Sequence, residues 1–110
     1  NYTLLKIMNA DKSEEVLTWS EWLDFDKTTI ETVPESPGLY KMHASMKILY
    51  IGSSTQNIKK SLIDCLSDTC ISKAKRFSYA LTTSSDKVRE QLLNEYRTKH
   101  NKLPECMKEN

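Results

Sequence analysis

The sequence contains two short runs that combine tyrosine with glycine, Gly-Leu-Tyr at residues 38–40 and Tyr-Ile-Gly at residues 50–52. Nine residues separate Tyr40 from Tyr50, which is enough for two antiparallel strands joined by a short turn near residues 44–45. A phenol has a pKa of about 10 in water, so it transfers protons near neutral pH only where cations or hydrogen bonds make it more acidic. The spacing therefore predicts two tyrosines that meet on one small sheet.

Three strands and three helices are expected around these tyrosines. The strands cover residues 39–42, 47–51 and 77–81, and the order along the chain is helix, strand, strand, helix, strand, helix. This order predicts an α+β fold, a small three-stranded, mostly antiparallel sheet flanked by helices.

Apolar spacing predicts which side chains face the core. One helix should begin after an N-cap at Ser54, Thr55 or Asn57. A last helix should begin at residues 84–86 and run to about His100. The predicted buried stripes of these two helices are Ile58, Leu62, Cys65 and Leu66, and Val88, Leu92, Leu93 and Tyr96. In the third strand, alternation predicts a shared core face for Phe77, Tyr79 and Leu81.

The N-terminal part has apolar residues at helical spacing from residue 14 to residue 25, which predicts a short amphipathic helix. Trp19 and Trp22 belong to this pattern, and we expect them to pack on the core. The alternative is that an exposed tryptophan anchors a protein partner. We accordingly expect residues 1–32 to form a helical extension that packs on a domain of residues 33–110.

The chain has 110 residues, sufficient for one modest core, and it begins at Asn1, so we expect it to be cut from a longer protein. No apolar run could span a bilayer, and no membrane partner is expected. Three cysteines, an odd number, favour reduced thiols in an intracellular protein of the cytoplasm, nucleoid or nucleus. A zinc site is a weaker alternative, because no Cys-x-x-Cys pair is present. Its candidate ligands are Cys65, Cys70 and Cys106 with His43 or His100.

The formal net charge is +1, but the charges are unevenly distributed. Residues 1–52 carry five Lys/Arg and eight Asp/Glu, whereas residues 53–110 carry eleven and seven. Lys73, Lys75 and Arg76 precede the aromatic strand, where basic groups beside aromatic rings can hold a nucleic-acid strand. The second half is thus the candidate nucleic-acid surface, and an ordinary solvated surface is the alternative.

The two tyrosine-glycine runs resemble the signature of the GIY-YIG nuclease family. Further matching features are Pro37 before the first run, two serines after the second, Asn57 at the start of a helix, the aromatic strand, and Pro104. The resemblance extends over residues 33–107, which is most of the chain, and it implies a GIY-YIG-like fold.

This resemblance implies a domain that hydrolyses DNA phosphodiesters with one divalent cation, Mg²⁺ or Mn²⁺, as in DNA repair or recombination. Tyr40 and Tyr50 would lie at the site, where one phenol helps to deprotonate the attacking water and the other positions it. Gly52 would let the backbone approach the phosphate closely. Ser53 and Ser54, near a helix N-terminus, would contact phosphate.

The phosphate-binding arginine of the family is replaced in this chain. The corresponding position on the first helix of the domain is Ser61, which cannot provide a bidentate contact to phosphate. Lys59 or Lys60 could reach the site, but a lysine offers a point charge without the planar fork. Cys65 stands where many members carry a histidine, and Met107 stands where the family has an asparagine.

The metal ligand of the family is replaced as well. The position of its glutamate is occupied by Arg89, and Glu90 and Glu95 are the nearest candidates for a replacement ligand. Without a carboxylate, a hard cation such as Mg²⁺ has little to hold it.

We therefore predict a domain that keeps the GIY-YIG fold and binds DNA, with impaired catalysis. Two alternatives remain open. One is an active endonuclease, in which Lys60 replaces the arginine and Glu95 or Glu90 binds the metal. The other is a protein-interaction module on the same fold. A divalent cation is expected only for the active enzyme, and no small-molecule cofactor is expected.

Overall fold

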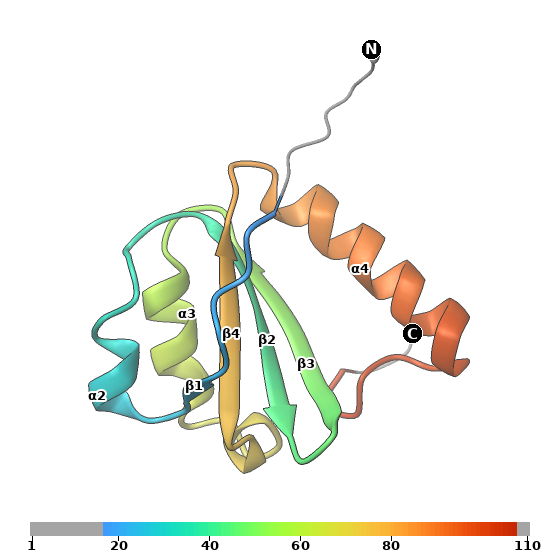
Figure 1. Cartoon of the computed structure of the whole chain (residues 1–110), viewed down its shortest axis with the longest axis horizontal. Helices are drawn as coiled ribbons and strands as arrows, with labels where there is room; N and C mark the ends of the chain where they lie inside the picture. Colours follow the sequence, from blue (N-terminus) through green and yellow to red (C-terminus); the bar gives the residue numbers. More distant parts are fainter. Residues whose placement is uncertain (1–16, 108–110) are drawn as a thin grey trace.

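One antiparallel sheet organises the fold. In the computed structural model, which describes residues 17–107, four strands lie in the order β1-β4-β2-β3 (Figure 1). The elements in chain order are β1 (Leu23–Asp24), α2 (Lys27–Ile30), β2 (Gly38–Ala44), β3 (Lys47–Ser54), α3 (Ile58–Cys65), the 3₁₀ turn η2 (Ile71–Lys73), β4 (Arg76–Leu81) and α4 (Ser85–His100). The expected α+β class is confirmed, but the sheet has four strands and not three.

The hairpin of β2 and β3 brings the two tyrosine-glycine runs together, as expected from their spacing. Tyr40 lies opposite Gly52, and Met42 lies opposite Tyr50. Ser45 has φ 56° at the tip of the hairpin, in the left-handed region that tight turns require. The predicted turn and strand pairing are therefore confirmed.

Helix α3 covers the sheet face that carries Tyr40 and Met42. Its N-cap is Asn57, whose side-chain oxygen accepts a hydrogen bond from the N–H of Lys60 at 3.1 Å. Of the four residues predicted for the apolar stripe, Ile58, Leu62 and Cys65 are buried, and Leu66, the C-cap, is partly buried. The main core consists of Ile30, Val33, Tyr40, Met42, Leu49, Ile58, Leu62, Cys65, Ile71, Ala74 and Phe77.

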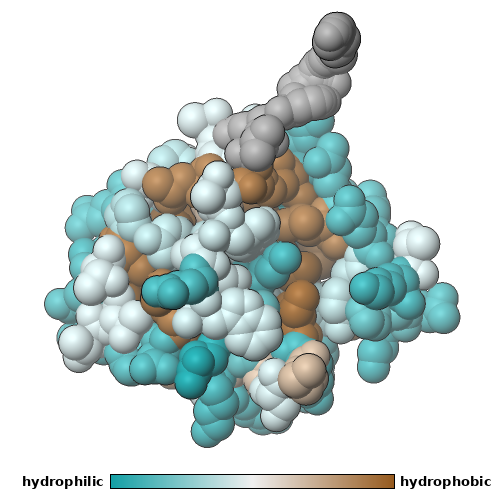
Figure 2. Space-filling view, viewed as in Figure 1, coloured by the Kyte–Doolittle hydropathy of each residue, from teal (hydrophilic) through white to brown (hydrophobic). Residues whose placement is uncertain are grey.

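Helix α4 covers the opposite face, beside β3, and this layer is less completely closed. The residues predicted as the buried stripe of α4 are only partly buried, so that prediction is wrong in degree. The physical reason is that α4 packs at an edge strand. Part of its apolar face opens onto a cavity of about 230 Å³ between Ile51 and Leu92. Hydrophobic surface is visible between the sheet and α4 (Figure 2).

Strand β4 is covered on both faces, which changes its expected burial pattern. Phe77 is buried as predicted, but Leu81 is 45% exposed, and Ser78 and Ala80 on the other face are buried. The Oγ of Ser78 lies 3.1 Å from Nε2 of the buried His43. The apolar alternation predicted one core face, whereas two layers bury this strand.

The N-terminal helix predicted for residues 14–25 does not form in the described part, residues 17–25; residues 14–16 lie outside it. Leu23 and Asp24 instead pair with β4 as the short strand β1, and Ser20 N–H donates to the carbonyl of Tyr79 at 2.8 Å. The free edge of β4 offers backbone partners that a helix could not use. The proposed division between residues 1–32 and 33–110 remains a prediction.

Both tryptophans of this segment lie on the sheet. The Trp22 ring stacks on His43, with centroids 3.9 Å apart, and the Lys41 ammonium lies 4.3 Å from the centre of the Trp19 ring. Trp22 is still 52% exposed, because it covers the sheet with one face of its ring.

The cysteine prediction is wrong for two of the three residues. Cys70 and Cys106 form a disulfide, and Cys65 is a buried free thiol. The zinc alternative is wrong too, since two of its sulfurs are bonded to each other and residues 17–107 contain no group of three potential ligands. Among the described helices, none is both long and apolar enough to cross a membrane.

Candidate functional site

Tyr40 and Gly52 form a cross-strand pair in which the glycine makes room for the ring. A Cβ atom at Gly52 would lie 2.6 Å from Oη of Tyr40, closer than real Cβ atoms approach. The phenol ring therefore lies flat over the backbone of β3. This packing role differs from the close approach to phosphate expected from the resemblance, which stays a prediction.

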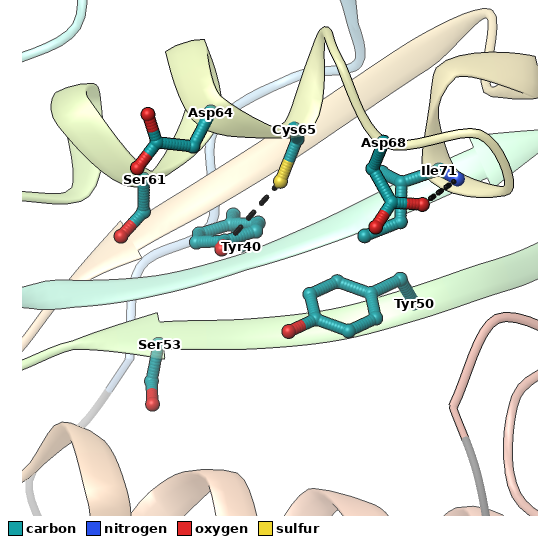
Figure 3. A pocket seen from close by; sticks show the side chains of 8 residues that line it. All are labelled: Tyr40, Tyr50, Ser53, Ser61, Asp64, Cys65, Asp68 and Ile71. Carbon is teal, nitrogen blue, oxygen red and sulfur yellow. Dashed lines mark hydrogen bonds between the residues drawn. The ribbon is translucent and has the colours of Figure 1, made fainter.

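The hydroxyl of Tyr40 is enclosed by α3. The side chain is only 4% exposed, and Sγ of Cys65 donates a weak hydrogen bond to Oη at 3.7 Å (Figure 3). Burial raises the pKa of Tyr40 above its ordinary value, and the nearby Cys65 and Tyr50 raise it further. Tyr40 therefore remains a protonated phenol at neutral pH and is unsuited to act as a general base.

Tyr50 stands beside Tyr40 at the mouth of a cavity of about 300 Å³ between α3 and β3. The two ring centroids are 6.1 Å apart, and the Tyr50 ring is only partly buried (Figure 3). The cavity is lined by Tyr40, Tyr50, Ser53, Ser61, Asp64, Cys65, Asp68 and Ile71. We call this the tyrosine pocket.

The charge in the tyrosine pocket is negative. Asp64 and Asp68 line it, and no lysine or arginine among residues 17–107 does. Oδ1 of Asp68 accepts hydrogen bonds from the N–H groups of Ile71 at 2.9 Å and Cys70 at 2.8 Å, which lower the pKa of Asp68. The carboxylates would repel a phosphate that entered the pocket.

The lysines proposed to replace the arginine do not line the pocket. Ser61 does line it, at the position where the resemblance implies an arginine. Lys60 is exposed, and Lys59 lies 3.6 Å from Glu35 in an ion pair. The equivalence of Ser61 to the arginine position stays a prediction, and the replacement by Lys60 has no support in the geometry.

The two serines after Gly52 are engaged within the protein. Oγ of Ser54 accepts hydrogen bonds from the N–H groups of Gln56 and Asn57 at 3.2 and 2.9 Å, and this turn leads into α3. Ser53 donates to a carboxylate oxygen of Asp86 at 3.2 Å. Their proposed contact with phosphate stays a prediction.

Helix α4 presents a guanidinium to the sheet edge beside Tyr50. Nε of Arg89 donates to the carbonyl oxygen of Ile51 at 3.0 Å, and Ser85 Oγ donates to the carbonyl of Ser54 at 3.0 Å. These two bonds attach α4 to the outer edge of β3. The position where the resemblance implies a carboxylate thus carries a cation that makes a structural contact.

The candidate metal ligands on α4 do not lie with the tyrosines. Glu90 is exposed, and Glu95 lines the cavity on the opposite sheet face, together with Lys41. Within residues 17–107, no three His, Cys, Asp or Glu side chains are grouped as a cation site. The residues present therefore do not fit the divalent cation that the fold family implies.

The predicted basic residues lie near one end of the sheet. Arg76 forms an ion pair with Asp24 at 2.9 Å, while Lys73 and Lys75 are exposed. Sequence reasoning missed Lys47, which lies 2.6 Å from Glu105. No local sequence signal could have found this pair, because 57 residues separate its members.

The fold and the paired tyrosines define a GIY-YIG-like domain. Two solved structures resemble it, both of the GIY-YIG N-terminal endonuclease domain of UvrC from Thermotoga maritima. They are tyrosine point mutants with the catalytic divalent cation bound, 17% and 16% identical to this chain with TM-scores of 0.54 and 0.53. Each match covers 73% of this chain and 91% of the other. At this identity the likeness shows the fold alone.

The chain belongs to the family described as "Domain of unknown function (DUF7508)", which matches residues 17–99. No curated protein matches the sequence. The GIY-YIG-like fold is therefore shown, and the activity has to be argued from this chain's own residues.

Proposed function

We propose that this domain binds DNA through a GIY-YIG-like fold and has lost metal-dependent cleavage. The observation that carries the proposal is the hydrogen bond from Arg89 to the carbonyl of Ile51. A guanidinium bonded to the carbonyl of Ile51, the residue that follows Tyr50, opposes binding of Mg²⁺ or Mn²⁺ nearby. Replacement of a metal-binding carboxylate by a cation removes both the Lewis acid and its bound water.

The environment of Tyr40 supports the same conclusion. A general base must lose its proton at the working pH, and burial raises the pKa of Tyr40. Asp64 and Asp68 in the tyrosine pocket would also repel the scissile phosphate. The described residues of the pocket thus provide none of the positive charge that stabilises the transition state of phosphoryl transfer.

Support for DNA as the partner comes from the fold and from the charge distribution. The similar solved structures are named endonuclease domains, and residues 53–110 of this chain carry eleven basic and seven acidic residues. Exposed lysines bind phosphates without sequence preference and release counterions. We therefore expect weak, salt-dependent binding of DNA.

The test combines binding and cleavage on the same substrates. Fluorescence anisotropy with labelled duplex and branched DNA should show binding that weakens steeply with salt. Incubation of supercoiled plasmid with the domain and Mg²⁺ or Mn²⁺ should leave the plasmid intact. Cleavage that the Tyr50→Phe variant lacks would overturn the loss of catalysis, and absence of binding at low salt would overturn the assignment of DNA.

A further inference from the structure

At the hairpin end of the sheet, one carboxylate is paired with one lysine and feels the charge of two more. Nζ of Lys47 lies 2.6 Å from Oε1 of Glu105. The hydrogen bond and charge of Lys47 lower the pKa of Glu105, and the charges of Lys73 and Lys102 lower it further. We call these three lysines the lysine cluster. Glu105 is thus an anion held in a group of cations.

The members of this group come from three segments that the fold brings together. Lys47 begins β3 after the hairpin tip, Lys73 ends η2, and Lys102 and Glu105 belong to the segment that follows α4. The hairpin, η2 and this segment gather at the lower end of the sheet (Figure 1). All four side chains are exposed, so a large partner could reach the lysines if Glu105 were displaced.

The disulfide connects the carboxylate to the cluster. Cys106 follows Glu105 directly, and it is bonded to Cys70, three residues before Lys73. Cys106 N–H also donates to the carbonyl of Leu49 at 2.8 Å, on the outer edge of β3. These two links hold Glu105 beside Lys47.

We propose that the lysine cluster is the phosphate-binding surface of the domain, and that Glu105 blocks it as an internal competitor held by the Cys70–Cys106 disulfide. Reduction by a dithiol yields the two cysteine thiols, with both protons and electrons supplied by the dithiol, which becomes a disulfide. Release of the segment then frees Lys47 and Lys73 for DNA phosphates. This inference rests on the proposed binding of DNA.

The distribution of charge favours the lysine cluster over the tyrosine pocket as the place where phosphate binds. Among residues 17–107, the pocket is lined by two carboxylates and no basic side chain, whereas the charges of three lysines act on Glu105. The two adjoin, because Ile71 lines the pocket and begins the turn η2 that ends at Lys73. DNA on the cluster would therefore pass beside the tyrosines without placing a phosphate between Asp64 and Asp68.

The test measures affinity for a fluorescein-labelled DNA duplex by anisotropy, with the oxidised domain at several salt concentrations. Glu105→Gln should tighten binding about three- to tenfold at low salt and make the salt slope more negative by about one unit, since one more lysine meets phosphate. Glu31→Gln is the matched control, because it removes the same charge from an exposed residue that belongs neither to the lysine cluster nor to the segment after α4.

Reduction provides the second arm. Dithiothreitol should tighten binding of the unmodified domain by a similar factor and should add little to the Glu105→Gln variant. A Lys47→Ala, Lys73→Ala double variant should lose most of the affinity in both redox states.

The outcomes separate the two proposals. Binding that Glu105→Gln and reduction both leave within twofold of the oxidised domain would overturn this inference while the proposed function stands. No binding in any form would overturn both.

Discussion

The fit of Tyr40 over Gly52 yields the most specific prediction about the site. Gly52→Ala would place a methyl group 2.6 Å from Oη of Tyr40 and as close to its ring carbons. The ring cannot move outward freely, because the side chain is 4% exposed and Cys65 lies on its far side. Overpacking of this kind costs about 1–3 kcal/mol, so we expect a loss of stability in that range.

A double-mutant cycle isolates the cause. Tyr40→Leu removes the ring atoms that the new methyl group would meet, so Gly52→Ala should cost little or nothing in that background. The two substitutions should therefore be coupled by about 1–3 kcal/mol. The measurement is urea denaturation of the four proteins, followed by fluorescence of the tryptophans.

Gly38→Ala is the control substitution in the same strand pair. Its Cβ would meet the backbone of β4, nearest to the carbonyl oxygen of Ala80 and 3.2 Å from Cα of Leu81, and no side-chain movement can relieve that contact. Its cost should therefore be the same with and without Tyr40→Leu. Equal destabilisation by Gly52→Ala in both backgrounds would refute the packing role of this glycine.

Three further predictions concern stability. Burial lowers the pKa of His43 from 6.5 to about 4. Between these pH values the unfolded state binds a proton that the folded state does not. The free energy of unfolding should therefore fall by about 1–3 kcal/mol as the pH falls from 6.5 to 4. Urea denaturation across this range tests the prediction, and a His43→Gln variant should lose most of that slope. Arg89→Ala should cost about 1–3 kcal/mol by urea denaturation, because it leaves a partly buried carbonyl without its charged donor, whereas Lys87→Ala on the same helix should cost under about 0.5 kcal/mol. A result in which both variants cost the same would contradict the contact. Reduction of the Cys70–Cys106 bond, whose cysteines are 36 residues apart, should lower stability by about 3–4 kcal/mol in the chain-entropy view, and an unchanged urea midpoint in dithiothreitol would contradict it.

The sequence was sufficient for the parts of the fold that local signals determine. The hairpin follows from the spacing of Tyr40 and Tyr50, and α3 follows from the Asn57 cap and its apolar spacing. Both signals act between residues close in the sequence. The tyrosine pair of the candidate site was predictable for the same reason.

The N-terminal segment could not be predicted in this way. Trp19 and Trp22 are three residues apart, which fits a helix. The conformation is instead decided by the free edge of β4, which pairs with β1, and by the contacts of the two tryptophan rings with Lys41 and His43 on the sheet. Tertiary contacts override the local preference here.

The disulfide and the lysine cluster could not be predicted from the sequence either. Cys70 and Cys106 have no local spacing signal, and Lys47 meets Glu105 only because the end of α4 returns to the hairpin. Such pairs depend on the packed arrangement of elements and not on any periodicity.

The central claim is that this GIY-YIG-like domain binds DNA and does not cut it. The most direct measurement is a single-turnover incubation with Mn²⁺, in which the domain is in excess over labelled branched DNA at a concentration where anisotropy shows all of the DNA bound. We predict that the bound DNA remains intact over hours. Product that accumulates with the unmodified domain, and not with Tyr50→Phe, would contradict the account.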